Sequence, residues 1–408
     1  MKHLSGLKLT LLSVLTVFAL SGGGLATVTT WQDSLTIGDV TVTSGDGWGS
    51  SHKFTQISAG ANHTVAIDTN GAAWAWGDNQ YGQLGDGTAT KRKTPVKVAG
   101  GHKFTQIEAT AHHTTAIDTT GQAWAWGKNT YGWLGVGDRT NKYTPALVLG
   151  GHQFTQISAG GTHTVAIDDS GQAWAWGSNE YGQLGAGFAG DEYTPVKVSR
   201  DCKFVRISAG EDHTVAIDDS GQAWAWGEND RGQLGDGFTI KERNPVKVNG
   251  AQKFSRIKAG LQSTVALDAD GNLWAWGHYT IATLRWGDLE NKTSPIRIFQ
   301  DHKFSQISPS KEKLSLAEDR HYAVAIDLSK HAWAWGGNHF GQLGDGTTTD
   351  RNTLVQVLGG HEFKKISAGF RHTVAIDSNG NAWAWGNNYF GQLGDGTTTS
   401  SPIPVKVS

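Results

Sequence analysis

Cysteine is almost absent from this chain, because Cys202 is the single cysteine among 408 residues. A lone cysteine cannot form an internal disulfide bond, so packing must supply the stability of the fold. Cys202 stands at a junction between sequence repeats, where the other repeats hold different residue types. This variation favours a neutral position over a catalytic nucleophile.

Charged residues are also scarce, at 18% of the chain, and the formal net charge is only −2. Such a composition creates no strong field for nucleic acid or for an anionic membrane. We therefore expect no nucleic acid partner. Nothing in the sequence resembles a basic arm.

Catalytic and metal-binding motifs are missing as well. The chain has no Gly-x-Ser-x-Gly elbow and no His-x-x-x-His or Glu-x-x-His pattern. Its Gly-Gln-Leu-Gly runs lack the lysine and the following helix of a phosphate-binding loop. We therefore expect a protein that is not an enzyme and that uses no metal and no cofactor.

The N-terminus has the order and size of a secretory signal peptide. Lys2 and Lys8 precede an apolar run over residues 9–20, and the small residues Gly24 and Ala26 follow it. The apolar run is too short to span a bilayer, so we expect no stable membrane insertion. The sequence therefore predicts a signal peptide over residues 1–26 and a secreted or periplasmic protein.

The most abundant feature is the tetrapeptide Trp-Ala-Trp-Gly, which begins at residue 74 and occurs seven times at nearly constant spacing. In an extended strand the two tryptophans share one face and the alanine lies on the other. Such strands suit small sheets stacked face to face, where the large side chains of one sheet fit the shallow side of the next. The other copies begin at residues 124, 174, 224, 274, 333 and 383.

Each repeat of about fifty residues predicts four short strands, which in the first repeat cover residues 54–59, 63–67, 73–76 and 95–98. An aspartate such as Asp68 stands at the turn between the second and third strands in all seven repeats. Capping of that turn by an aspartate hydrogen bond explains this better than seven metal ligands would. Four strands, seven repeats and no helical stretch predict an all-β fold, a single seven-bladed β-propeller.

The propeller is expected over residues 53–408, preceded by an N-terminal extension over residues 27–52. Residues 40–42 of the extension resemble residues 96–98 at the end of the first repeat. The extension therefore offers one extra strand, which we hypothesise could pair beside the last repeat and close the ring.

These repeats resemble the regulator-of-chromosome-condensation repeat family over residues 53–408. The signature residues read Ala-Gly-Gly-Thr-His-Thr at 159–164 and Trp-Gly-Ser-Asn-Glu-Tyr-Gly-Gln-Leu-Gly at 176–185. The resemblance implies a seven-bladed propeller. In the chromatin-bound relative that gives the family its name, acidic residues just before the repeat histidine promote nucleotide exchange on a small GTPase. By position, that loop is acidic here only at Glu211 and Asp212.

Two residue types recur at fixed places in the repeat. We place a histidine at the same position in six of the seven repeats. Its recurrence favours hydrogen bonding within the blades over a ring of metal ligands. A second position holds an aromatic residue, or Arg231 in the fourth repeat. Together these side chains could form a ring of exposed anchors for a protein or a sugar; alternatively, each one covers its own loop. The histidines are His63, His113, His163, His213, His321 and His372, and the aromatic residues are Tyr81, Tyr131, Tyr181, Phe340 and Phe390.

Partner recognition is expected where the repeats differ, because variable positions on a rigid repeat carry specificity. The pair of residues before the repeat histidine varies, the fifth repeat is irregular, and the sixth has about eight extra residues. Drift without selection is the alternative explanation for the two irregular repeats. The candidate partner-binding residues are Glu211, Asp212, Leu261, Gln262, Arg285, Trp286, Lys311, Lys313, Phe370 and Arg371.

The family resemblance also covers secreted bacterial propellers that inhibit an enzyme by docking one face of the ring on it. The sequence therefore predicts an exported, monomeric, non-catalytic scaffold whose partner is a secreted or envelope enzyme. The alternative is a guanine nucleotide exchange factor for a small GTPase, including one in a host cell. Carbohydrate binding through the loop aromatics is a third hypothesis.

Overall fold

The computed structural model describes residues 52–278, 291–311 and 321–408, together with four short strands before residue 44. The chain divides into two compact units, Met1–His52 and Lys53–Ser408. The candidate residues Arg285, Trp286 and Lys313 lie outside the described residues. Within the described residues, no helix combines the length and the hydrophobicity that a membrane crossing requires.

The first unit contains two antiparallel strand pairs. Strand β1 (Thr16–Phe18) pairs with β2 (Leu25–Thr27), and β3 (Ser34–Ile37) pairs with β4 (Val40–Thr43). The strand predicted at residues 40–42 is therefore present as β4, and its partner is β3.

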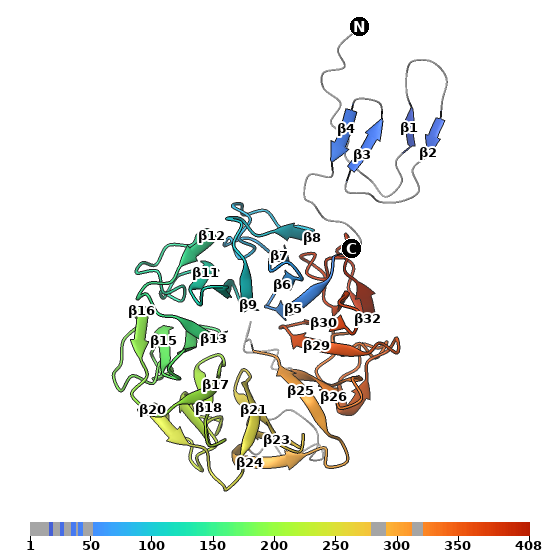
Figure 1. Ribbon diagram of the computed structural model, residues 1–408. Helices are drawn as coiled ribbons and strands as arrows, with labels where there is room; N and C mark the ends of the chain where they lie inside the picture. Colours follow the sequence, from blue (N-terminus) through green and yellow to red (C-terminus); the bar gives the residue numbers. More distant parts are fainter. Residues whose placement is uncertain are drawn as a thin grey trace. The chain divides into compact units, whose positions relative to one another are not determined.

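The second unit is a ring of seven four-stranded antiparallel sheets around a central channel (Figure 1). Each sheet, or blade, takes its four strands from one contiguous stretch of chain, in sequence order from the channel outward. The predicted all-β seven-bladed propeller is confirmed.

The innermost strands of the seven blades line the channel. They are β5 (Phe54–Ala59), β9 (Phe104–Ala109), β13 (Phe154–Ala159), β17 (Phe204–Ala209), β21 (Phe254–Ala259), β25 (Phe304–Pro309) and β29 (Phe363–Ala368). The second strands are β6 (His63–Asp68), β10 (His113–Asp118), β14 (His163–Asp168), β18 (His213–Asp218), β22 (Ser263–Asp268), β26 (Tyr322–Asp327) and β30 (His372–Asp377).

The third strands carry the tryptophan tetrapeptide, and the fourth strands form the outer rim. The third strands are β7 (Ala73–Gly77), β11 (Ala123–Gly127), β15 (Ala173–Gly177), β19 (Ala223–Gly227), β23 (Leu273–Gly277), β27 (Ala332–Gly336) and β31 (Ala382–Gly386). The fourth strands are β8 (Arg92–Lys97), β12 (Lys142–Leu147), β16 (Glu192–Lys197), β20 (Glu242–Lys247), β24 (Lys292–Ile298), β28 (Arg351–Gln356) and β32 (Ser401–Lys406).

The second tryptophan of each tetrapeptide packs on the alanine face of the preceding blade. Trp126 of the second blade is fully buried in one hydrophobic cluster with Ala73 and Ala75 of the first. Its indole Nε1 donates to the Gln83 carbonyl at 3.0 Å. A Cβ on Gly85 would lie 2.7 Å from that Nε1, so the close approach requires glycine. This is the bulk-against-alanine packing that the alternation in the sequence predicts.

The repeat aspartate caps the turn between the second and third strands. Asp68 accepts bonds from the backbone amides of Asn70 and Ala72 through Oδ1, at 2.8 and 2.9 Å. Its Oδ2 accepts the indole N–H of Trp74 at 3.0 Å, and the other six blades repeat this contact. The turn role predicted for the aspartate is therefore confirmed, with a second role in orienting the first tryptophan.

The ring closes through the same contacts that join any two blades. The amide of Phe54 donates to the Gly380 carbonyl at 2.8 Å, and Trp76 Nε1 donates to the Gln392 carbonyl at 2.9 Å. The last blade takes its fourth strand, β32, from the C-terminal end of the chain. Each sequence repeat starts with the innermost strand of a blade and ends with its outermost strand, so all seven blades have four strands of their own. The ring-closing strand hypothesised at residues 40–42 is therefore not needed to complete any blade.

Candidate protein-binding face

One face of the propeller carries the loops between the first and second strands and between the third and fourth strands. Antiparallel pairing places both loops at the same edge of each blade, and the amide of Asp78 in one loop donates to the Asn62 carbonyl in the other at 2.8 Å. The second strands begin at this edge and end at the opposite face with the repeat aspartate. We call this side of the propeller the loop face.

The repeat histidines are buried below the loop face and link neighbouring blades. His163 of the third blade contacts Thr214 Oγ1 of the fourth through Nε2 at 2.8 Å. Burial lowers the pKa of His163 to about 3, so the ring is neutral at physiological pH. The same histidine–threonine contact joins three further pairs of blades, through His63, His213 and His372. The recurring histidine thus forms part of the joints between blades.

The assignment of His321 to this set was wrong. Tyr322 pairs with Gly336 as His63 pairs with Gly77, so Tyr322 occupies the repeat-histidine position in the sixth blade. Its hydroxyl donates to the carbonyl of His372, in the seventh blade, at 2.6 Å. The extra residues of the sixth repeat lie before residue 321, so its repeat position cannot be found by counting forward from the first strand. Counting back five residues from the turn aspartate, as from Asp68 to His63, gives Tyr322 from Asp327.

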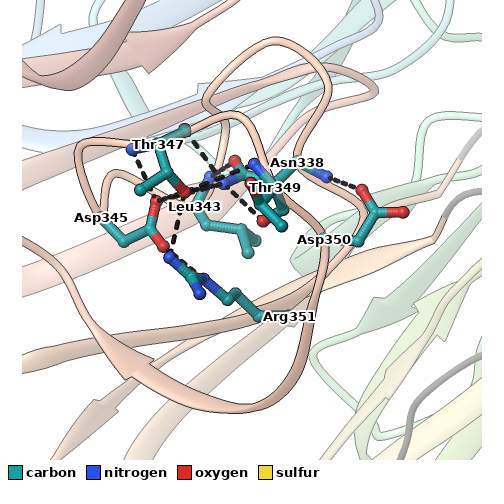
Figure 2. A network of polar contacts seen from close by, with 7 residues as sticks. All are labelled: Asn338, Leu343, Asp345, Thr347, Thr349, Asp350 and Arg351. Atoms are coloured by element: carbon teal, nitrogen blue, oxygen red, sulfur yellow. Dashed lines mark hydrogen bonds and ion pairs between the residues drawn. The ribbon is translucent and has the colours of Figure 1, made fainter.

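The long loops between the third and fourth strands are held from within by a buried asparagine, as Figure 2 shows for the sixth blade. The side-chain amide of Asn338 donates to Asp345 Oδ1 and to the carbonyls of Thr347 and Thr349, each at 3.1 Å. Arg351 Nε in turn donates to Asp345 Oδ2 at 2.6 Å. These loops are therefore built as rigid platforms. The equivalent buried asparagines are Asn79, Asn129, Asn179, Asn229 and Asn388.

The two variable positions of the repeat meet at the joints between blades. The aromatic residue of one blade packs against the residue just before the repeat histidine of the next. Tyr81 contacts the ring of His112, with centroids 5.1 Å apart, and the Arg371 guanidinium lies 4.7 Å from the Phe340 ring centre. Most of these aromatics are half-buried, whereas Tyr131 is 45% exposed. The covering role therefore dominates over a ring of exposed anchors.

Four carboxylates lie near Tyr181 at the joint between the third and fourth blades, together with Lys241, whose Nζ is 5.8 Å from the centre of the Tyr181 ring. Burial first, and then the charges of four nearby carboxylates, raise the pKa of the Tyr181 hydroxyl. Two of the carboxylates, Glu180 and Asp230, are exposed. We call the four residues Glu180, Asp212, Glu228 and Asp230 the acidic sector.

The predicted pair Glu211 and Asp212 lies at this joint and is half-buried. Asp212 Oδ1 accepts from Thr162 Oγ1 at 2.9 Å and from Gln183 Nε2 at 3.3 Å. A Cβ on Gly161 would lie 2.2 Å from Glu211 Oε2, so the glycine makes room for this carboxylate. Both acids are thus positioned by the third blade.

The structure separates the other described candidates. Leu261 is only 2% exposed and belongs to the core, while Gln262, Phe370 and Arg371 are half-buried. Lys311 lines the central channel. Within the described ranges, no group of three or more His, Cys, Asp or Glu side chains is placed to hold a metal ion.

Sequence reasoning missed three exposed apolar side chains on the same long loops as Glu180 and Asp230 of the acidic sector. Phe188, Phe238 and Ile240 are 40, 64 and 66% exposed, and they belong to the long loops of the third and fourth blades. The buried Asn179 donates to the Phe188 carbonyl at 2.9 Å, so the backbone below the exposed ring is fixed. Comparison of the repeats could have revealed the two phenylalanines, because the first blade has Thr88 at the position of Phe188 and Phe238.

Comparison with known proteins agrees with this architecture. The family model for the Regulator of chromosome condensation (RCC1) repeat matches residues 70–117, 120–167, 170–217, 220–267, 331–376 and 379–408. A second model of the same description matches residues 54–83, 104–132, 154–183, 204–233 and 363–392. Together these matches cover more than half of the chain.

Among curated proteins, the human E3 ubiquitin-protein ligase HERC2 is 42% identical over 48 residues. That match spans 12% of this chain and only 1% of the human protein.

Among solved structures, human WBSCR16 superposes with a TM-score of 0.72 at 18% identity, covering 80% of this chain and 88% of that one. Prp20p from Saccharomyces cerevisiae, whose structure is described with its binding properties to Gsp1p and histones, gives 0.66 at 22% identity over 78% and 81% of the two chains. At these identities the likeness shows the fold alone. The repeat matches, however, cover most of the propeller, and the chain belongs to the RCC1 repeat family.

Proposed function

We propose that this chain is an exported, non-catalytic scaffold that binds a partner protein on the loop face at the third and fourth blades. The observation that carries the proposal is the combination of the acidic sector with exposed Phe188, Phe238 and Ile240 on loops fixed by buried asparagines. Export is inferred from residues 1–26 of the sequence.

The geometry of this surface suits protein recognition. A rigid loop presents its side chains without an ordering cost on binding, which raises affinity for a given contact area. Exposed aromatic and aliphatic groups supply anchors, and the surrounding carboxylates supply specificity and a faster association rate. A partner with a basic rim around an apolar patch has the matching chemistry, and a secreted or envelope enzyme is the class of partner we propose.

A capture experiment tests this proposal. The mature chain, residues 27–408, would be used to capture proteins from the envelope and medium of the source organism, followed by quantitative binding of the captured protein. The double variant Glu180→Lys and Asp230→Lys should weaken binding at least about tenfold, because both exposed charges are reversed next to the partner.

The matched control is the double variant Asp169→Lys and Asp219→Lys. These aspartates are exposed and follow the second strands of the same two blades, at the opposite face. Equal loss of binding in both double variants would refute a site on the loop face. Loss with Trp286→Ala alone would move the site to the irregular fifth repeat.

Guanine nucleotide exchange on a small GTPase is the second candidate. It is favoured by Glu211 and Asp212, since both lie just before the repeat histidine and are held in place by contacts with the third blade. The test is release of labelled nucleotide from a small GTPase with wild type and with Asp212→Ala. Catalysed release that Asp212→Ala abolishes would establish exchange, whereas release at the uncatalysed rate would leave the scaffold function.

A further inference from the structure

The central channel holds a cavity of about 380 Å³ that the described innermost strands line. Figure 1 shows these strands around the channel. The charged side chains lining the cavity are three lysines, Lys258, Lys311 and Lys365, and one carboxylate, Glu108. Among the described residues, positive charge therefore exceeds negative charge in this cavity.

In most blades the innermost strand carries a serine whose hydroxyl bonds to the next blade. The Ser58 hydroxyl of the first blade accepts from the Ala109 amide of the second at 3.0 Å. Four other blades repeat the contact with their equivalent serines, Ser158, Ser208, Ser308 and Ser367. A hydroxyl that accepts an amide proton keeps its own proton for donation. Ser308 and Ser367 line the cavity and can donate to a ligand there.

The serine ring is broken where the fifth blade meets the sixth. Lys258 replaces the serine, and the residue that would donate an amide proton to it is Pro309. Proline has no N–H, so no acceptor is required at residue 258. The paired change frees this position from its structural role and places an ammonium group in the channel, for which the described residues supply no hydrogen-bond or ion-pair partner.

The second break is in the second blade, where Glu108 replaces the serine. Its Oε2 still accepts from the Ala159 amide, at 3.2 Å. Its Oε1 forms an ion pair with Lys311 of the sixth blade, and the two side chains are 16 and 15% exposed. Burial raises the pKa of Glu108, but the charges of Lys311 and Lys258 outweigh it and keep the carboxyl ionised. Glu108 is thus paired directly with Lys311, whereas Lys258 acts on it through its charge without a direct contact among the described residues. Burial lowers the pKa of Lys258, and the charge of Glu108 acts in the opposite direction.

We propose that this cavity binds a small oxyanion of the phosphate, sulfate or carboxylate type. Lys258 supplies an ammonium group that makes no direct ion pair within the described residues, Lys311 supplies a second ammonium beside Glu108, and the hydroxyls of Ser308 and Ser367 supply neutral donors. An anion here would neutralise the excess positive charge and connect the fifth, sixth and seventh blades. The site lies in the channel, separate from the acidic sector on the loop face.

Titration calorimetry of the full chain with inorganic phosphate tests the proposal, with sodium chloride at matched ionic strength as the reference. Lys258→Ser restores the serine found in five other blades and should weaken phosphate binding at least about tenfold, since it removes a charge-assisted bond. Lys97→Ser removes an exposed lysine from an outer strand and should leave binding unchanged.

A second variant should change the affinity for phosphate in the opposite direction. Glu108→Ser also restores the repeat residue, keeps an acceptor for the Ala159 amide and releases Lys311, so phosphate binding should strengthen several-fold. Parallel titrations with sulfate and succinate would show which oxyanion the cavity prefers. The proposal is overturned if none of the three anions binds to wild type, if Lys258→Ser binds phosphate as wild type does, or if Glu108→Ser binds it more weakly.

Discussion

His163 and Thr214 form a directed hydrogen-bond relay between two blades. Thr214 Oγ1 donates its only proton to the Gln183 carbonyl at 2.8 Å, so it must accept from His163 Nε2 at 2.8 Å. This order fixes the proton on Nε2 and leaves Nδ1 unprotonated. The relay begins in the third blade, passes through the fourth and returns to the third, so each step holds the joint closed.

The neutral histidines make stability depend on pH. Burial lowers the pKa of His163, His213 and His372 to about 3, below the ordinary value of 6.5. Between pH 6.5 and 3 the unfolded chain therefore binds more protons than the folded chain, and acid favours unfolding. This contribution is fully present above pH 6.5 and falls by about 1.4 kcal/mol per pH unit for each such histidine.

Thermal or denaturant unfolding between pH 7 and 4 checks this expectation. His163→Gln should reduce the slope of stability against pH by the share of one histidine. A melting temperature that stays constant from pH 7 to 5 would contradict the buried neutral state.

Thr214→Val should destabilise the propeller by about 1–3 kcal/mol, because it leaves the buried N–H of His163 without an acceptor. Thr115→Val is the matched control with the opposite sign. Thr115 is fully buried, its hydroxyl has no hydrogen-bond partner in the described part of the chain, and the first blade has Val65 there. Removing that hydroxyl should stabilise the fold by about 1–2 kcal/mol. Urea unfolding of both variants measures the change in the free energy of unfolding. If both substitutions changed it in the same direction, the relay would be contradicted.

Gly185→Ala should destabilise by about 2–4 kcal/mol, since a left-handed backbone and a displaced indole both oppose the new methyl group. Gly185 has φ +68°, and its Cβ would lie 2.6 Å from Trp226 Nε1. Gly151 has the same φ with no atom within 4 Å of its Cβ, so Gly151→Ala reports the backbone strain alone. The excess loss of unfolding free energy in Gly185→Ala measures the joint with Trp226. If the two variants lost equal stability, tight packing there would be disproved.

Removal of residues 27–52 from a chain that begins at residue 27 should leave the melting temperature of the propeller unchanged. The seventh blade has its own fourth strand, and its joint with the first blade repeats the contacts of the other joints. Calorimetry of the chain from residue 27 and from residue 53 makes the comparison. A fall of several degrees in the shorter chain would show that the extension stabilises the ring.

The fold could be predicted from the sequence because its determinants are local and repeated. Trp74, Trp76 and Asp68 recur at fixed spacing, and each acts within its own blade or on the adjacent one. Seven copies of one pattern therefore reveal both the strand order and the packing.

The candidate site was harder to predict, because it depends on where loops meet across a joint. The proximity of Tyr181 to Asp212 joins two different repeats, and Lys311 reaches Glu108 in a distant blade. The exposure of Phe238 depends on the Asn229 network that fixes its loop. The contacts of Tyr181 and Lys311 join different repeats, so the spacing within one repeat does not reveal them, whereas the asparagine itself recurs in six blades.

The contiguous blades also determine how the ring can be taken apart. Since no strand is exchanged between the first and last blades, the propeller is an open string of seven units whose two ends meet by side-by-side packing. A chain that began at any other joint would build the same ring, so circular permutants should fold. Under a pulling force on the two ends, the joint between β29–β32 and β5–β8 should open first, and the blades should then unravel one by one from either end.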